Sequence, residues 1–366
     1  MLFKLLHRKV LIPVGIVLVV IILLMSVWTK SSELDQAEPL ITFPAQGQDT
    51  ISALTWGADS SILITGYSNG KLSIFPISDN GNHFSIISTP RTITSLAASP
   101  NNLLIGVGYE NGIVEVWNIR DDVLLFEAKN HADWIHSLAW SPDGTLLASS
   151  SPDKTVIWDI STGEILTSLQ GDMVSLVWAH NSILVGRGLN TLTYVWNIST
   201  KQLLSNIDAG VNIAVSSDGS KLAGMQGNRM MIWNLDDGKV LPDSNGRGGD
   251  TMRWNPDNTR IAIADGSLSN DYSVRIQDAL TSKLELTLKG HTEPVFSLAW
   301  HPEKNYLISV SFDDTVRIWD ITTGDIVRIL KIEEINDASK SMLSPDLSKI
   351  AVVTGDESIA VWTLFP

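Results

Sequence analysis

Short runs of apolar residues alternate with polar turns along the chain, and the alternation recurs with a period near 40 residues from about residue 39 onward. The clearest copies are residues 129–169 and 289–330. Each predicts four β-strands: an apolar strand ending in Trp, a second strand, an Asp-bearing tight turn with a third strand ending in Trp-Asp, and a fourth strand after a Thr-Gly turn. Self-similarity at this period predicts a repeat architecture, because one such unit cannot bury its apolar faces alone.

An aromatic position near the end of each third strand counts the copies. It recurs eight times at intervals of 37 to 44 residues, and Gln277 marks the one copy in which the aromatic is lost. The eight positions are Phe75, Trp117, Trp158, Trp196, Trp233, Gln277, Trp319 and Trp362. A large aromatic at this place can fill the space between neighbouring units.

These copies resemble the WD-repeat family, whose repeats form the four-stranded blades of a β-propeller. The resemblance implies an all-β, eight-bladed WD-repeat β-propeller over residues 39–366, with a seven-bladed ring and one leftover degenerate copy as the alternative. The chain stops after the eighth third strand, and the segment Pro39–Phe43 is similar to the fourth-strand segments of other copies. We expect this segment to complete the last blade, which would close the ring and remove its exposed edges.

An uncharged run of 20 residues, 10–29, precedes the repeats. It is long enough to cross a bilayer as a helix, and longer than the apolar core of a cleaved signal peptide, which is the rival interpretation. Basic residues are concentrated before the run, which predicts a cytoplasmic segment 1–9, a single transmembrane signal anchor 10–29 and a short tether 30–38. The propeller is then expected outside the cytoplasm, with a cytoplasmic propeller as the alternative.

The remaining composition narrows the function classes. The formal net charge is −14, from 40 acidic and 26 basic residues, and such a chain is repelled by phosphate backbones, so we expect no nucleic-acid partner. There are no cysteines, which excludes disulfides, thiolate metal sites and cysteine nucleophiles. Metal-binding and hydrolase motifs such as HExxH and GxSxG are absent, and we expect no cofactor, no metal and no enzymatic activity.

The family resemblance also implies a hydrogen-bonded set of four side chains in each well-formed blade. The matching residues are His291, Ser309, Asp313 and Trp319 in the seventh copy, and His131, Ser149, Asp153 and Trp158 in the third. A catalytic triad is the competing interpretation, but recurrence of the spacing within a repeat favours a structural network. In the third copy the Asp lies one residue closer to the Trp, so either a bulge restores the register or the set is incomplete.

Propellers of this family bind partners on the face made by the loops before strand one and between strands two and three, hereafter the loop face. The candidate binding residues there are Trp134, Arg91, Arg247, Glu293 and the loop from Asp265 to Tyr272, which is longer than its counterpart in the seventh copy. Trp134 is either a binding hot spot or a side chain tucked under its neighbouring blade. We interpret residues 245–249 as a flexible connector, and we expect Lys340 to point into the central channel.

Together these patterns predict a non-enzymatic protein-interaction scaffold, tethered to a membrane, that binds protein partners on its loop face. The alternative is an extracytoplasmic sensor or binding module for a ligand or glycan, which would use the mouth of the channel.

Overall fold

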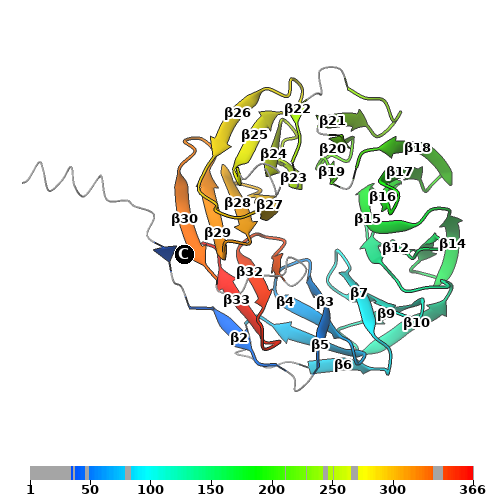
Figure 1. The fold of residues 1–366 in the computed structure, drawn as a ribbon. Helices are drawn as coiled ribbons and strands as arrows, with labels where there is room; N and C mark the ends of the chain where they lie inside the picture. Colours follow the sequence, from blue (N-terminus) through cyan, green and yellow to red (C-terminus); the bar gives the residue numbers. More distant parts are fainter. Residues whose placement is uncertain are drawn as a thin grey trace, which may run out of the picture.

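Eight sheets, each built on four antiparallel strands, follow one another around a ring in the described part of the computed structural model (Figure 1). The structure describes the following residues: 34–35, 38–45, 49–78, 84–210, 212–227, 229–241, 246–249, 251–264, 271–332 and 341–365.

Each sheet is one blade, and the four strands run in sequence order from the centre of the ring outward in every blade except the eighth, whose outer strand is β2. Blade one consists of β3 (Ile51–Trp56), β4 (Ile62–Tyr67), β5 (Lys71–Pro76) and β6 (Phe84–Ser88), and blade two of β7 (Ile93–Ala98), β8 (Leu104–Tyr109), β9 (Ile113–Asn118) and β10 (Val123–Lys129). Blade three consists of β11 (Ser137–Trp140), β12 (Leu146–Ser150), β13 (Thr155–Asp159) and β14 (Glu164–Leu169), and blade four of β15 (Met173–His180), β16 (Ile183–Gly188), β17 (Leu192–Asn197) and β18 (Gln202–Asp208).

The second half of the ring repeats this order. Blade five consists of β19 (Ala214–Val215), β20 (Lys221–Gln226), β21 (Arg229–Asn234) and β22 (Gly246–Arg247), and blade six of β23 (Thr251–Trp254), β24 (Arg260–Ala264), β25 (Val274–Asp278) and β26 (Leu284–Leu288). Blade seven contains β27 (Val295–Trp300), β28 (Tyr306–Ser311), β29 (Thr315–Asp320) and β30 (Ile326–Lys331), and blade eight consists of β31 (Ser341–Leu343), β32 (Lys349–Val353), β33 (Ile359–Thr363) and β2 (Ile41–Phe43).

The ring is closed by a strand from the start of the repeat region. β2 pairs antiparallel with β33, with Ile41 opposite Val361 and Phe43 opposite Ile359. Blade eight therefore combines three strands from the end of the chain with one from residues 41–43, as the sequence predicts. Eight complete blades also exclude the seven-bladed alternative.

The hydrophobic core is divided into eight clusters, and each cluster lies between two adjacent blades. One of them joins blade eight to blade one, where Phe43 packs against Phe75 with ring centroids 4.6 Å apart. The middle strands β4 and β28 are buried almost throughout, because both of their faces pack against a neighbouring blade. A cluster at every junction, including the one between the last blade and the first, makes the fold a continuous ring.

Two short strands differ from the sequence-based expectation. β1 (Leu34–Asp35) falls within the predicted tether, yet it pairs in parallel with β30 as a fifth strand of blade seven. β22 (Gly246–Arg247) falls within the run interpreted as a flexible connector, yet it pairs with β21 as the outer strand of blade five. Backbone pairing along an exposed strand edge needs no particular side-chain pattern, which is why composition alone assigned both segments to loops.

Residues 1–9 and 10–29 lie outside the described residues, as does most of the predicted tether. Within the part of the chain that is described, no helix has the length and apolarity required to cross a membrane.

Candidate functional site

The hydrogen-bonded set of blade seven is complete. The indole N–H of Trp319 donates to Ser309 Oγ at 2.8 Å, and Ser309 Oγ lies 2.7 Å from His291 Nε2. At the other nitrogen of the imidazole, His291 Nδ1 lies 2.9 Å from Asp313 Oδ2. An ionised carboxylate only accepts hydrogen bonds, so Nδ1 carries the proton and Nε2 accepts the Ser309 hydroxyl proton.

The electrostatics of this network agree with a neutral histidine. Burial lowers the pKa of His291, and the hydrogen bond to Asp313 opposes the shift only in part. Burial alone would raise the pKa of Asp313, but hydrogen bonds from His291, Thr315 and the backbone N–H of Thr292 hold it well below its usual range. The carboxylate is thus kept charged by its donors, and the network has one stable proton arrangement at neutral pH.

Blade three carries the same set in a looser form. Trp158 Nε1 donates to Ser149 Oγ at 2.8 Å, and His131 Nε2 lies 2.8 Å from the same oxygen. The distance from His131 Nδ1 to Asp153 Oδ1 is 3.3 Å, and the Asp153 side chain is 28% exposed, against 4% for Asp313. Burial lowers the pKa of His131 as it does in blade seven.

The spacing from Asp153 to Trp158 is one residue shorter than the matching spacing in blade seven, and the turn between β12 and β13 accommodates the difference. Ser149 stands opposite Val156 and Trp158 opposite Leu147, with no register shift between β12 and β13. The turn itself is closed by a hydrogen bond from the Ser151 N–H to the Lys154 carbonyl. Neither alternative predicted from the sequence is correct, because no bulge is needed between these strands and the set is nevertheless complete.

Both sets are sealed within the blades. His131, His291, Ser149 and Ser309 are buried, and each serine hydroxyl is held between an indole and an imidazole. A nucleophile needs access to a substrate and a nearby oxyanion-stabilising site. The geometry therefore supports a structural role for the two sets and provides no open triad.

Arg91 belongs to a different buried network, in blade two. Its Nη1 lies 3.1 Å from both Glu115 Oε1 and Glu127 Oε2. Glu115 Oε2 in turn accepts the Tyr109 hydroxyl at 2.7 Å and the Trp117 indole N–H at 2.8 Å. Burial raises the pKa of both Glu115 and Tyr109. Arg91, a candidate binding residue in the sequence, thus pairs with the buried Glu115 and the exposed Glu127, and this network stands where other blades have the usual set.

Arg247 lies at the junction of blades five and six. It is the second residue of β22, and its backbone carbonyl accepts a hydrogen bond from Arg275 Nη1 at 3.0 Å. Arg275 Nη2 also binds the carbonyl of Gly248 at 2.7 Å. Gln277, the residue that replaces the usual aromatic, packs beside the same segment. A buried arginine thus holds the outer strand of one blade from the next blade.

Trp134 is exposed on the loop face, just before the innermost strand of blade three. Its side chain is 49% exposed, so it is not tucked under the neighbouring blade. The Trp134 ring lies nearly perpendicular to the His136 ring, with centroids 4.6 Å apart, and the backbone N–H of Trp134 donates to Asp133 Oδ1. About half of the surface of Trp134 is thus accessible for contact, while His136 supports its ring.

The other candidates are spread around the ring. Glu293 is exposed, and its backbone carbonyl accepts the Ser311 hydroxyl. Tyr272 is half-buried before β25. Asp265 and Lys340 lie outside the described residues. The structure does not bring Trp134, Arg91, Arg247 and Glu293 together, because they belong to blades three, one-to-two, five and seven.

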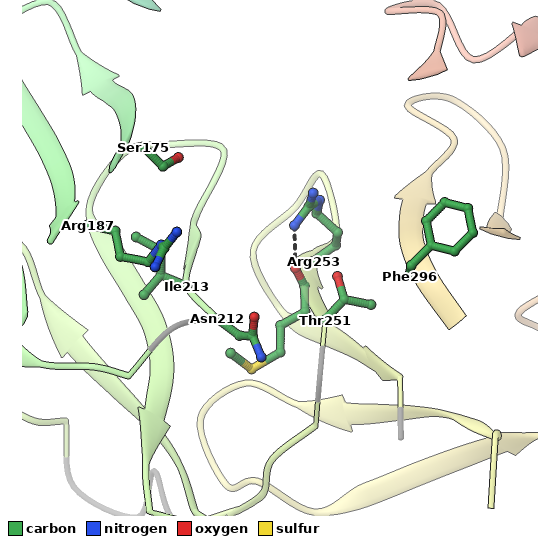
Figure 2. Close-up of a pocket in the computed structure, with 8 residues that line it drawn as sticks. Ser175, Arg187, Asn212, Ile213, Thr251, Arg253 and Phe296 are labelled. Atoms are coloured by element: carbon green, nitrogen blue, oxygen red, sulfur yellow. Dashed lines mark hydrogen bonds between the residues drawn. The ribbon is translucent and has the colours of Figure 1, made fainter. Parts of the chain in front are cut away.

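A pocket that the sequence did not reveal opens on the loop face, beside the starts of innermost strands. Figure 2 shows the residues that line it. Its volume is about 270 Å³. Its walls come from the innermost strands β15, β23 and β27, from the end of β16 and from the segment before β19. The lining residues are Ser175, Arg187, Asn212, Ile213, Thr251, Met252, Arg253 and Phe296.

One signal in the sequence could have revealed part of this pocket. Arg253 stands in an innermost strand at the place occupied by Ala139 and Ala299 in blades three and seven. A charged side chain at such a place must face the centre of the ring, which is the argument applied to Lys340. Arg187 gave no comparable signal, because a second-strand residue reaches the pocket only through the way blades four and five pack together.

Comparison with known proteins supports the architecture. The model of the family described as WD domain, G-beta repeat matches residues 37–75, 123–159 and 282–320. Each segment covers the outer strand of one blade and the first three strands of the next, and it ends at or just after the aromatic position used to count the repeats. Three segments of the chain therefore match WD40 repeats, and they lie within an eight-bladed β-propeller.

Its similarity to curated WD-repeat proteins is partial. The chain is 34% identical over 119 residues to the COMPASS component SWD3 of Saccharomyces cerevisiae, which covers 32% of this chain and 36% of that protein. It is 28% identical over 138 residues to the WD repeat and SOCS box-containing protein 1 of Mus musculus, covering 37% of this chain and 32% of the relative. The matched segments thus span about a third of each relative's length.

Solved structures extend the likeness to the whole ring. The C-terminal WD40 domain of Sif2 matches with a TM-score of 0.72 at 18% identity, covering 91% of this chain and 99% of that one. The computationally designed Ika8 protein matches with a TM-score of 0.70 at 20% identity, covering 90% and 100%. At these identities the likeness concerns the fold. WD40-repeat proteins are generally non-enzymatic scaffolds, in agreement with the expectation that this chain is not an enzyme.

Proposed function

We propose that this WD40-repeat propeller is a membrane-tethered scaffold that binds protein partners on its loop face, with Trp134 as an anchor residue. The observation that carries the proposal is the exposed, supported indole of Trp134 on a rigid scaffold whose polar networks are internally satisfied. A large aromatic held in one orientation loses little conformational entropy on binding, which is typical of interface hot spots.

The distribution of polar groups favours a scaffold over a catalyst. His131 and His291 each have a carboxylate and a serine partner, and these hydrogen bonds stabilise the blades. The ion pair between Arg91 and Glu115 likewise stabilises its blade. What remains accessible on the loop face is suited to recognition, because loops on a rigid ring can vary without disturbing the core.

The names of similar proteins point in the same direction. One relative is a component of COMPASS and another carries a SOCS box beside its WD repeats. A chain in a crystal structure of the mitotic checkpoint complex matches with a TM-score of 0.61 at 16% identity. Relatives that work within assemblies support protein partners for this chain, whose identity the chemistry of the loop face does not name.

Membrane tethering is supported by the uncharged run 10–29 and by the basic residues that precede it. We propose a single span with the N-terminus in the cytoplasm and the propeller on the opposite side. Such an anchor would hold the ring near a membrane and restrict its partners to molecules that reach that surface.

Site-specific photo-crosslinking in intact membranes tests the binding surface. A photoreactive amino acid placed at position 134 of the full-length protein is expected to yield discrete crosslinked products. The matched control is position 120, where an exposed arginine lies in the loop between the third and fourth strands of blade two, at the opposite face. Equal crosslinking from both positions, or none from position 134, would contradict the proposal.

Protease treatment of intact cells tests the orientation. With a C-terminal tag on the propeller, we expect the tag to be lost while a cytoplasmic control protein survives. Protection of the tag until lysis would place the propeller in the cytoplasm and overturn the proposed topology. Extraction of the protein from membranes by alkaline carbonate would overturn the transmembrane anchor.

A further inference from the structure

The pocket at the centre of the loop face contains two arginines without a carboxylate partner. Among the residues that the structure describes, Arg187 makes no hydrogen bond or ion pair, and Arg253 donates only to the backbone carbonyl of Met252, at 2.9 Å (Figure 2). By contrast, Arg91 and Arg260 each bind a glutamate. Acidic residues outnumber basic ones by 40 to 26, so unpaired arginines are unexpected.

The environment of Arg253 also favours the binding of an anion. Arg253 rises from β23 on the inner side of the ring, and although its side chain is accessible to solvent, protein surrounds it closely enough that burial lowers its pKa. A guanidinium stays protonated at physiological pH, so the site holds its positive charge at a cost in solvation. A bound anion would offset that cost and would be attracted more strongly than in bulk water.

Neutral donors complete a polar lining. The side chains of Ser175, Asn212 and Thr251 line the same pocket, and none of them makes a hydrogen bond to another described residue. Hydroxyl and amide groups beside two guanidinium groups match the geometry of an oxyanion, which accepts several hydrogen bonds at once.

One part of the lining is apolar. Phe296, Ile213 and Met252 contribute to the wall, and the Phe296 ring is held against Phe312 with centroids 4.7 Å apart. A volume of about 270 Å³ fits a small molecule or a single side chain, not a folded segment. Charged donors at one end and an aromatic wall at the other favour a ligand with both characters.

We propose that this pocket binds a small organic oxyanion, a carboxylate or phosphate with a short apolar group, held between Arg187 and Arg253. The acidic character of the rest of the protein disfavours an extended acidic polypeptide here, because its remaining charges would be repelled. This proposal names a ligand class for the alternative function predicted from the sequence, a ligand-binding module at the mouth of the channel. It does not depend on the proposed scaffold role.

Calorimetric titration and thermal unfolding of the detergent-solubilised full-length protein test the site. The probes are inorganic phosphate and phenyl phosphate, with phenol as the neutral control. We expect phenyl phosphate to bind more tightly than phosphate and phenol not to bind. Added salt should weaken binding. Arg187→Gln and Arg253→Gln should each lower the affinity for phenyl phosphate by about tenfold or more, because each removes a charge-assisted hydrogen bond.

Arg120→Gln is the matched control, since it removes one positive charge from an exposed loop far from the pocket, and it should leave the affinity unchanged. Arg187→Lys and Arg253→Lys keep the charge, so they separate lost binding from a folding defect and should retain part of the affinity. Absence of phenyl phosphate binding to the wild-type protein would overturn the proposal. So would binding that survives the double Arg187→Gln/Arg253→Gln variant, provided circular dichroism shows that the variant is folded. Crosslinking from position 134 does not depend on either arginine, so the two proposals can fail separately.

Discussion

Trp56 donates its indole N–H to the backbone carbonyl of Met342 at 3.0 Å, across the junction where the first blade meets the last. The two residues are separated by 286 positions in the sequence. The same contact recurs inside the ring, where the indoles of the innermost strands bind a carbonyl of the preceding blade. These contacts are Trp140 to Ala97, Trp178 to Ala139, Trp254 to Ala214 and Trp300 to Arg253. The closing junction is thus built like the internal ones.

Replacement of Trp56 by Phe should weaken the closing junction. Trp56 is 4% exposed, so the change removes a buried hydrogen bond and leaves a small cavity. We expect a loss of about 1–3 kcal/mol in the free energy of unfolding. Urea-induced unfolding followed by circular dichroism measures it. Trp134→Phe is the control, because Trp134 is exposed and makes no such contact, and it should change stability by less than about 0.5 kcal/mol.

Phe43→Ala tests the contribution of β2 to closure. Phe43 is 1% exposed and packs against Phe75, so we expect a loss of about 3–5 kcal/mol. Leu40→Ala, three residues earlier and 53% exposed, is the matched control and should be nearly neutral. Similar unfolding midpoints for the two variants would contradict closure by this strand.

Ser309→Ala should disrupt the network of blade seven. The change leaves the indole N–H of Trp319 and His291 Nε2 without their shared partner in a buried setting. We expect a loss of about 2–4 kcal/mol, since two buried polar groups lose a hydrogen bond. Ser151→Ala, in the turn of blade three, should cost less, because the Ser151 hydroxyl donates to the Asp133 carbonyl and does not link two buried side chains. Thermal unfolding compares the two.

Stability should fall on acidification because of the buried histidines. The pKa values of His291 and His131 are lowered in the folded protein from an ordinary value of 6.5, so below about pH 6.5 the unfolded chain takes up protons that the folded chain does not. Their contribution is therefore complete above that pH and is lost as the pH falls. The lowered pKa of Asp313 adds a further loss below its ordinary value of 3.8.

The measurement is the unfolding midpoint in urea between neutral pH and pH 5. His291→Gln is expected to be less stable than the wild-type protein at neutral pH but to lose stability less steeply on acidification. An unchanged slope in this variant would mean that His291 does not titrate as the geometry predicts.

The two carboxylates that bind Arg91 should contribute unequally. The Glu115 side chain is 2% exposed and also accepts hydrogen bonds from Tyr109 and Trp117, whereas the Glu127 side chain is 41% exposed. Glu115→Ala should cost about 3–5 kcal/mol, because it leaves buried polar groups unpaired. Glu127→Ala should cost less than about 1 kcal/mol, as expected for a surface pair. Equal losses in urea unfolding would contradict this assignment.

Much of the fold could be predicted from the third strands. Each carries an aromatic or its replacement at a regular interval, so the number of blades follows from counting, and the apolar segment at residues 39–43 reveals the closing strand. The two hydrogen-bonded sets were also predictable, since their spacing repeats between His131 and His291. The network of Glu115 was not predicted, although an acid two residues before Trp117 in an apolar strand was a visible signal.

The sequence by itself determined the repeat, the number of blades and the closure of the ring, because these depend on the periodic placement of apolar residues within each unit. Only the tertiary structure decided that Arg91 is paired with Glu115 and Glu127, that Trp134 is exposed and that Arg187 and Arg253 share a pocket. These outcomes depend on how neighbouring blades are placed around the ring. Contacts between units that are far apart in the chain are not encoded in the pattern of any single repeat.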